Sequence, residues 1–277
     1  MRGNIIMAVE YFFSDMDNTL LTSNGSITQE NIEIIKKIDT PFSLVSARAP
    51  IEMDFALDLL DLKGPQVGFN GGIVFQGTGN TRNVIEKKII NFQLAKLIVE
   101  SIVARFPDVS TSFYDENFWY TNEINKGIAY ESSLTKQSPI VKPLSQLFEK
   151  NIDIYKIMII IFDESVMTKV INYFTEAKFE SISVQRSGKN YLEITHEDAI
   201  KENGIKCILQ NKNINLENTY AFGDGHNDIP MFNIVGHAVA MANSALEVKQ
   251  YADYLTDTND NSGVGKFILK LLKNNPS

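Results

Sequence analysis

The chain has 277 residues, of which 44% are apolar and 22% are charged, and its formal net charge is −8 at pH 7. This length allows one large domain or two smaller ones, and the composition is that of a globular protein with enough apolar material for a core. The acidic balance argues against a nucleic-acid partner, which would require basic patches. It permits a small phosphorylated ligand, since a metal ion and one lysine can create a locally positive site.

The compartment is indicated by the cysteine content and by the apolar runs. Cys207 is the single cysteine, so an intrachain disulfide is excluded and a reducing compartment is favoured. The longest strongly apolar run, 157–162, is too short to span a bilayer. The first residues lack the pattern of a signal peptide. We therefore expect a cytoplasmic protein that has no membrane partner; the sequence carries no signal for an oligomeric state.

The first third of the chain alternates between strand and helix patterns. Strands are expected at 9–15, at 41–48 and on either side of the glycine-rich break within 66–75, and helices at 26–39 and 50–62. Thr28 is the expected N-cap of the first helix. Met53, Leu57 and Leu60 form an apolar stripe on the second helix. This alternation predicts a parallel sheet with helices on both faces.

The middle of the chain has a different order of elements. Helices are expected at 92–106, 142–150 and 165–177, a strand at 154–163, and hairpins at 109–122 and 181–195. The second hairpin should turn near Gly188. This order predicts a compact α+β unit inserted at 84–189.

After this insertion the alternation resumes. Helices are expected at 198–212, 228–235, 244–252 and 263–273, and strands at 219–225, 237–242 and 253–256. The predicted fold is therefore α/β, a doubly wound, Rossmann-like parallel sheet built from 1–83 and 190–277 and interrupted by the α+β insertion.

Two aspartates stand at the end of the first predicted strand, in "YFFSDMDNTLL". In open α/β sheets, ligands bind outside the carboxyl ends of the strands. Side chains two residues apart in a strand share a face, and carboxylates as close as Asp15 and Asp17 would raise each other's pKa unless a cation held both. Such an oxygen-rich site suits Mg²⁺. Taken alone, this pair fits an acidic turn better.

Three further signals fall at comparable positions. Ser46 ends the second strand, Lys201 opens a helix, and "AFGDGHND" ends a later strand with Asp224, Asn227 and Asp228. Each has an ordinary explanation on its own, as an N-cap, a solvated charge or a pair of capping acids. Together they predict an aspartate pair, a hydroxyl, a lysine and a second acid pair at one edge of the sheet.

These residues resemble the haloacid dehalogenase superfamily, and the closest match is its Cof-like branch, subclass IIB. The resemblance is carried by "DMDNTLL", "VSAR", "FNGG", the lysine in "IKENGI" and "GDGHNDIPM", and it spans nearly the whole chain. It implies a phosphatase whose inserted unit is a cap that selects the substrate. Asn18 stands where this family most often has glycine, and "SAR" replaces the commoner Thr-Gly-Arg. The approach to Lys201 lacks the usual glycines.

The resemblance also implies roles for individual residues. Asp15 would be the nucleophile that forms an aspartyl-phosphate, and Asp17 the general acid and base. Mg²⁺ would be held by Asp15, by the backbone carbonyl of Asp17 and by Asp224. The remaining residues with an implied role bind phosphate (Met16 and Ala47 through amides, Ser46, Lys201 and Asn227), orient other groups (Asp228) or line the mouth of the site (Asn70 and Gly71).

The expected substrate is a small phosphorylated metabolite, such as a sugar phosphate. Arg186, Trp119 and Tyr120 lie in the predicted hairpins of the cap and are candidates for its selection, although aromatic residues there fit a core equally well. A phosphosugar mutase of the same superfamily would share every motif. A non-catalytic phosphometabolite-binding or signalling protein is a further alternative; a response-regulator receiver, for example, would lack the inserted domain.

Overall fold

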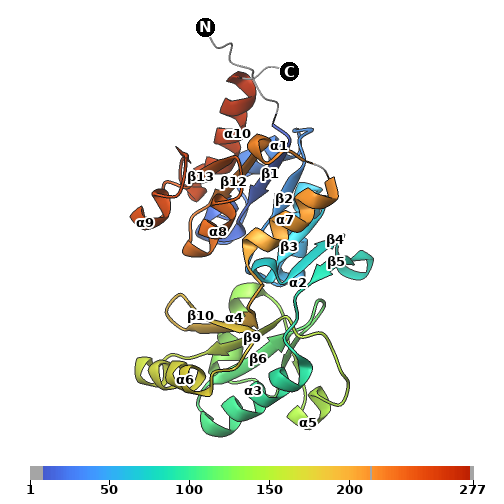
Figure 1. The fold of residues 1–277 in the computed structure, drawn as a ribbon, viewed down its shortest axis with the longest axis vertical. Helices are drawn as coiled ribbons and strands as arrows, with labels where there is room; N and C mark the ends of the chain where they lie inside the picture. The colour runs from blue at the N-terminus through green and yellow to red at the C-terminus, as the bar shows by residue number, and fades with distance from the viewer. Residues whose placement is uncertain (1–8, 213, 275–277) are drawn as a thin grey trace. The chain divides into compact units, whose positions relative to one another are not determined.

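The computed structural model describes residues 9–212 and 214–274, which form two compact units (Figure 1). Within these ranges the first unit contains 9–48, 53–86 and the residues from 200 onward, and the second contains 49–52 and 87–199. The sequence predicts an insertion at 84–189. The structure ends the second unit at Ala199, because both strands of the second hairpin pair within that unit.

The first unit is built around a five-stranded sheet in the order β14-β13-β12-β1-β2. Its strands are β1 (Tyr11–Ser14), β2 (Phe42–Leu44), β12 (Thr219–Gly223), β13 (His237–Ala240) and β14 (Tyr254–Leu255). All four neighbouring pairs are parallel. The predicted α/β class is therefore confirmed, and β1 lies between β12 and β2.

Helices cover both faces of this sheet (Figure 1). On one face, Phe267 of α10 (Gly263–Asn274) contacts the rings of Tyr220 and Phe222, and α10 packs beside α1 (Gln29–Ile35). On the other face, Phe13 and Ala221 form a buried cluster with residues of α7 (Lys201–Lys212) and α8 (Ile229–Phe232). The structure also contains α2 (Pro50–Leu60) and α9 (Leu246–Lys249).

The glycine-rich stretch differs from the predicted parallel arrangement. β3 (Gln66–Gly68) and β4 (Ile73–Gln76) pair antiparallel, and β5 (Asn83–Lys87) completes a separate three-stranded sheet. A parallel bridge between Val67 and Val45, the residue after β2, links this sheet to the central sheet. The tight turn after β3 reverses the chain, which is why β4 cannot continue the parallel order.

The second unit contains a six-stranded sheet in the order β10-β11-β9-β6-β7-β8. Its strands are β6 (Ser110–Tyr114), β7 (Trp119–Thr121), β8 (Ile140–Val141), β9 (Lys156–Ile160), β10 (Ile182–Ser187) and β11 (Tyr191–His196). The neighbouring pairs are antiparallel except β7 with β8. Both predicted hairpins are present, and Gly188 takes a positive φ of 60° in the turn of the second.

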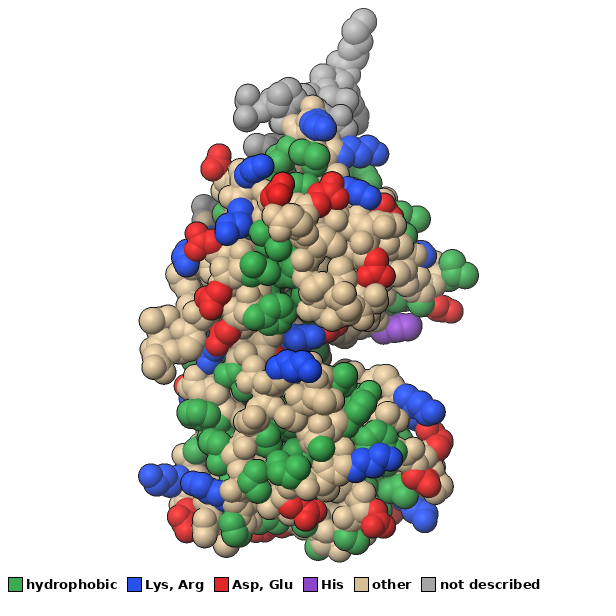
Figure 2. Space-filling view, turned by 180° about the vertical axis from the view of Figure 1, so that it is seen from behind, with side chains coloured by type: hydrophobic (Ala, Val, Ile, Leu, Met, Phe, Trp, Pro, Cys, Tyr) green, Lys and Arg blue, Asp and Glu red, His purple; other side chains and the backbone are tan. Residues whose placement is uncertain are grey.

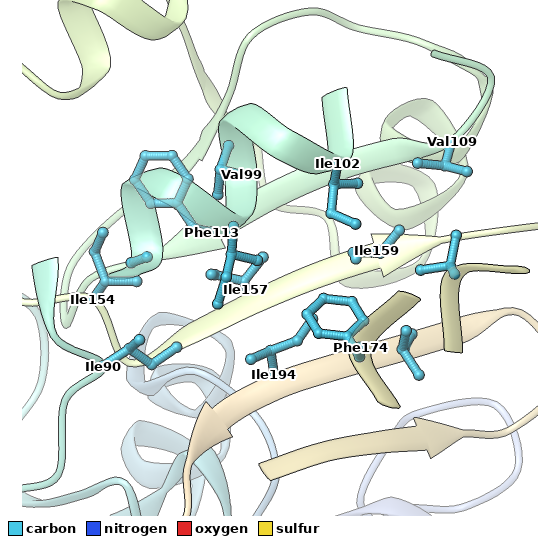
Figure 3. Packing of buried hydrophobic residues seen from close by; sticks show 14 of the residues in the cluster. Ile90, Val99, Ile102, Val109, Phe113, Ile154, Ile157, Ile159, Phe174 and Ile194 are labelled. Atoms are coloured by element: carbon cyan, nitrogen blue, oxygen red, sulfur yellow. The ribbon is translucent and has the colours of Figure 1, made fainter. Parts of the chain in front are cut away.

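One face of this sheet carries the core of the unit. Ile157, Ile159 and Ile194 alternate along β9 and β11 and pack against α3 (Phe92–Arg105) and α6 (Glu164–Ala177), as Figure 3 shows. The short helix α5 (Leu144–Leu147) matches its prediction, whereas α4 (Lys126–Thr135) and β8 were not foreseen.

The helices in the described ranges are all too short or too polar to serve as a membrane span. Acidic and basic side chains are interspersed over the face of the molecule that Figure 2 shows.

Candidate active site

The predicted polar residues of the first unit follow the carboxyl ends of three adjacent strands. Asp15 comes directly after β1, Asp224 directly after β12, and Ser46 two residues after β2. Because these strands are parallel neighbours, their ends lie at one edge of the sheet. The amide of Asp15 donates to the carbonyl of Phe222 at 2.9 Å, which extends the register by one residue.

Lys201 joins two of the acids. Its Nζ donates to Oδ1 of Asp15 and to Oδ1 of Asp228, at 2.6 Å in both cases. Lys201 is 1% exposed, Asp15 6% and Asp228 0%, so water is largely excluded from these contacts. Burial alone would lower the pKa of Lys201, but the two carboxylates outweigh it and raise that pKa, so the lysine is a fixed cation.

Both carboxylate oxygens of Asp228 accept hydrogen bonds from neighbouring groups. Its Oδ2 accepts hydrogen bonds from the amides of Asp224 and Gly225, at 2.8 Å each, while its Oδ1 accepts from Lys201. A Cβ on Gly223 would lie 2.5 Å from Cγ of Asp228, so only glycine fits at the end of β12. Asp228 therefore fixes the turn after β12 and the position of Lys201.

The folded structure disfavours the ionised forms of Asp15 and Asp224. Burial raises the pKa of Asp15 well above its usual range and the neighbouring acids add to this, while Lys201 opposes it. Burial also raises the pKa of Asp224 to about 6, against the hydrogen bond from Thr19 Oγ1 to its Oδ1 at 2.8 Å. Within the described residues, Oδ2 of Asp15 and Oδ2 of Asp224 accept no hydrogen bond.

These acids suit a divalent cation. One carboxylate oxygen from each of Asp15, Asp224 and Asp228 lies within 4.8 Å of the others. Two of the three acids keep an uncommitted oxygen at this edge, and a single lysine does not balance three carboxylates. Hard oxygen ligands of this kind are those that Mg²⁺ prefers, so the residues present fit the expected metal.

Asp17 lies in a different environment from the one the strand pattern suggested. β1 ends at Ser14, and a short π-helical segment, Met16–Leu20, follows. Asp17 thus does not share a strand face with Asp15. Its carboxylate forms a two-pronged ion pair with Arg48, at 2.6 and 2.9 Å, and its side chain is 51% exposed.

The predicted phosphate-binding residues surround this edge. Ser46 is buried, and its Oγ accepts a hydrogen bond from the amide of Arg48 at 3.1 Å. Its carbonyl accepts from the amide of Asn70 at 2.8 Å, and Oδ1 of Asn70 accepts from Nδ2 of Asn227 at 3.1 Å. Ala47 is partly buried beside Ser46. The structure therefore brings Ser46, Asn70 and Asn227 into one chain of contacts.

Gly71 has a structural reason to be glycine. Its φ is +102°, and an added Cβ would lie 2.1 Å from the carbonyl oxygen of Ile200. Ile200 immediately precedes Lys201, so this close approach sets where α7 begins. Met16 is buried at the start of the π-helical segment, and its carbonyl accepts from the amide of Leu21 at 2.8 Å.

Two contributors were missed from the sequence, Arg48 and Thr19. Arg48 lies in "VSAR" and Thr19 in "DMDNTLL", two of the motifs that carry the family resemblance. Their pairing with Asp17 and Asp224 depends on backbone turns that the residue pattern does not specify.

The three candidates of the second unit lie in distinct environments. Trp119 is 1% exposed and stacks on Tyr114. Tyr120 donates to Asp115 at 2.6 Å. Arg186 is exposed and pairs with Glu164 through two contacts at 2.6 and 2.7 Å.

The chain is similar to proteins named phosphatases. A putative phosphatase of Haemophilus influenzae is 30% identical over 264 residues, covering 93% of this chain and 96% of that protein. The protein of Bacillus subtilis named 5-amino-6-(5-phospho-D-ribitylamino)uracil phosphatase YwtE is 26% identical, covering 93% of this chain and 96% of its own.

Solved structures share the fold over almost the full length. The crystal structure of a Thermotoga maritima protein has a TM-score of 0.85 at 26% identity, covering 95% of this chain and 97% of that chain. A sugar phosphatase of haloacid dehalogenase subclass IIB has a TM-score of 0.77 at 21% identity, covering 94% of this chain and 98% of its own. The family model of haloacid dehalogenase-like hydrolases matches residues 12–268. The chain therefore belongs to the haloacid dehalogenase-like hydrolase family.

Proposed function

We propose that this enzyme is a Mg²⁺-dependent phosphatase that hydrolyses small phosphorylated metabolites, such as sugar phosphates, through an aspartyl-phosphate on Asp15. The observation that carries the proposal is the buried contact between Lys201 and Asp15 at the carboxyl edge of the sheet, 2.6 Å long and adjoining the acid cluster. The phosphatase names of the relatives agree with it.

In the first step, a carboxylate oxygen of Asp15 attacks phosphorus and the bond from phosphorus to the ester oxygen breaks. Lys201 accompanies Asp15 as a fixed positive charge, which favours the approach of a phosphate dianion. For this step Asp17 must leave Arg48 and be protonated, and it then gives that proton to the departing alcohol oxygen. The acyl phosphate on Asp15 and the free alcohol account for all atoms.

In the second step, water attacks phosphorus and Asp17, now ionised, accepts a proton from it. The bond between phosphorus and Asp15 breaks, which releases inorganic phosphate and restores the aspartate. Ser46, Lys201, Asn227 and the amides of Met16 and Ala47 would hold the phosphoryl oxygens through both steps. Such a phosphoryl transfer depends mainly on positioning the reacting groups and on stabilising their charge.

The metal would be held by Asp15, by the backbone carbonyl of Asp17 and by Asp224. When bound, Mg²⁺ neutralises negative charge where two anions must meet. Asp228 would act indirectly, since its two oxygens already hold Lys201 and the turn after β12. Asn70 and Gly71 would line the mouth of the site.

A phosphate-release screen against phosphorylated metabolites, with Mg²⁺ and with EDTA, tests the proposal. We expect release with Mg²⁺, loss with EDTA and recovery when Mg²⁺ is restored. Turnover that EDTA does not affect would contradict the metal's role. A sugar bisphosphate added to a sugar monophosphate separates hydrolysis from the mutase alternative, because a mutase would yield an isomer with little free phosphate.

A further inference from the structure

The segment after the first strand carries several groups of the candidate site. Asp15 precedes it, the carboxylate of Asp17 points from it to Arg48, and Thr19 donates from it to Asp224. Between these two residues, Asn18 has a φ of 56°, in the left-handed region. A non-glycine residue keeps this conformation only when its surroundings hold it there.

Two asparagines from other loops of the same unit hold this segment by its carbonyls. Nδ2 of Asn243 donates to the carbonyl of Asn18 at 2.8 Å, and Nδ2 of Asn259 donates to the carbonyl of Leu21 at 2.9 Å. The two asparagines also contact each other, because the amide of Asn259 donates to Oδ1 of Asn243 at 3.1 Å.

The asparagine pair, Asn243 and Asn259, comes from loops at the same edge of the sheet as Asp15. Asn243 follows β13, and Asn259 begins a short 3₁₀ turn, Asn259–Asn261, after β14. Asn259 is 4% exposed, so its carboxamide is committed to Leu21, whereas Asn243 is exposed. Composition predicts only that the stretch "TDTNDNSG", residues 256–263, is a loop. The contacts show in addition that Asn259 of this loop holds the segment after β1.

We propose that Asn243 and Asn259 are positioning residues of the active site, which fix the orientation of the segment that presents Asp17 and Thr19. The carbonyl held by Asn243 belongs to the peptide that joins Asn18 to Thr19, so its orientation affects the side chains on both sides. The inference rests on the proposed function, since it assigns Asp17 the acid and base role there.

Asn243→Ala tests this directly, because the residue is exposed and its removal creates no buried cavity. We expect its kcat on an alkyl phosphate, such as glycerol phosphate, to fall about tenfold, within the range that misplacing a reacting group can cost. On p-nitrophenyl phosphate, whose leaving group needs little protonation, we expect a loss of about twofold. KM and the melting temperature should stay close to those of the wild type.

Asn261→Ala is the matched control. Asn261 is exposed in the same loop, but its Nδ2 donates to Asp257 at 3.3 Å and not to the segment after β1. It should retain wild-type kcat on both substrates. Equal kcat for Asn243→Ala and Asn261→Ala on glycerol phosphate would overturn the inference, and so would equal losses on both substrates.

Asn18→Gly adds a second test through coupling. Glycine permits more backbone conformations at this position, so loss of the Asn243 contact should reduce kcat more in the Asn18→Gly background than in the wild type. Additive effects would contradict the role of Asn243 in holding the left-handed turn.

Hydrogen–deuterium exchange separates this inference from the proposed function, because it requires no activity. We expect faster amide exchange across 16–21 in Asn243→Ala and in Asn259→Ser than in Asn261→Ala. If the wild type released no phosphate, the proposed function would fail while the exchange result still decided whether the pair holds the segment. Unchanged exchange in both variants would overturn the inference.

Discussion

Lys201 Nζ lies 2.6 Å from Oδ1 of Asp15, although 186 positions separate the two residues in the chain. The contact exists because α7 begins beside the carboxyl end of β1, where Gly71 lets the turn after β3 approach Ile200. The two carboxylates on Lys201 fix a positive charge in a buried place, and that charge is the basis of the proposed chemistry.

Lys201→Met should abolish phosphate release and lower the free energy of unfolding. It leaves Asp15 and Asp228 buried without their cation, and breaking a buried ion pair costs about 3–5 kcal/mol of unfolding free energy. Urea unfolding and phosphate release measure the two effects. Lys206→Met on the same helix is the control, because Lys206 is an exposed lysine paired with Glu202, and it should change stability by less than about 1 kcal/mol. Similar unfolding free energies for both variants would contradict the assignment.

Gly71→Ala should displace the start of α7. Its Cβ would meet the carbonyl of Ile200 at 2.1 Å, so the turn and Lys201 must move apart. We expect a stability loss above about 2 kcal/mol, together with reduced kcat. Gly25→Ala isolates the backbone effect, since Gly25 also has a positive φ, of +79°, but no atom within 4 Å of the added Cβ. A loss no greater than that of Gly25→Ala would show that the close approach is unimportant.

Asp17→Asn should separate chemistry from stability. The side chain of Asp17 is 51% exposed, so loss of its pair with Arg48 should cost at most about 1 kcal/mol. Loss of a general acid and base should lower kcat by about 10²–10⁴-fold. Steady-state kinetics and thermal melts measure both, with Asp61→Asn, which removes an exposed partner of Lys63, as the control. Wild-type kcat for Asp17→Asn would exclude the acid and base role.

The Glu131→Gln variant should gain stability relative to the wild type as pH rises. Burial raises the pKa of Glu131 above its usual value, against the hydrogen bond from Tyr191 at 2.7 Å. The fold therefore binds this proton more tightly than the unfolded chain does, and the contribution of Glu131 to stability declines as pH rises through the raised pKa. The glutamine side chain of the variant stays neutral, so the stability of the variant relative to the wild type should increase as pH rises above the ordinary carboxyl pKa of about 4.3 and through the raised pKa of Glu131.

Chemical denaturation at several pH values measures this difference, with Glu149→Gln, at an exposed position of the same unit, as the control. A stability difference between wild type and Glu131→Gln that does not change with pH, or that falls as pH rises, would refute the burial argument.

The central sheet could be predicted because its strands are short, apolar and bounded by clear breaks. Phe12 and Phe13 in β1 and Phe222 in β12 are fully buried, and buried parallel strands read as continuous apolar runs. Asp15 and Asp224 were predicted because parallel strands deliver their following residues to one edge, whereas Lys201 opens a helix and its role was implied by the family resemblance. The N-cap of α1 was also readable, and Thr28 accepts from the amide of Asn31.

The elements that were missed have weak patterns. β5 has no buried residue, and its apolar residues Val84 and Ile85 are adjacent, so its sequence lacks the apolar–polar alternation that marks a strand. α4 contains Gly127, which lowers helix propensity, and it fits there because Ser110 leaves no space for a Cβ. The partners of Asp17 and Asn18 could not be predicted either, because Arg48 and Asn243 reach them through turns that only the folded backbone defines.

Phosphate release by Asp15→Asn tests the central claim most directly. An amide cannot attack phosphorus as the carboxylate does, so we expect activity on p-nitrophenyl phosphate with Mg²⁺ to fall at least about 10³-fold, while the melting temperature and circular dichroism stay those of a folded protein. Turnover by folded Asp15→Asn at a rate near that of the wild type would contradict the assignment of Asp15 as the nucleophile.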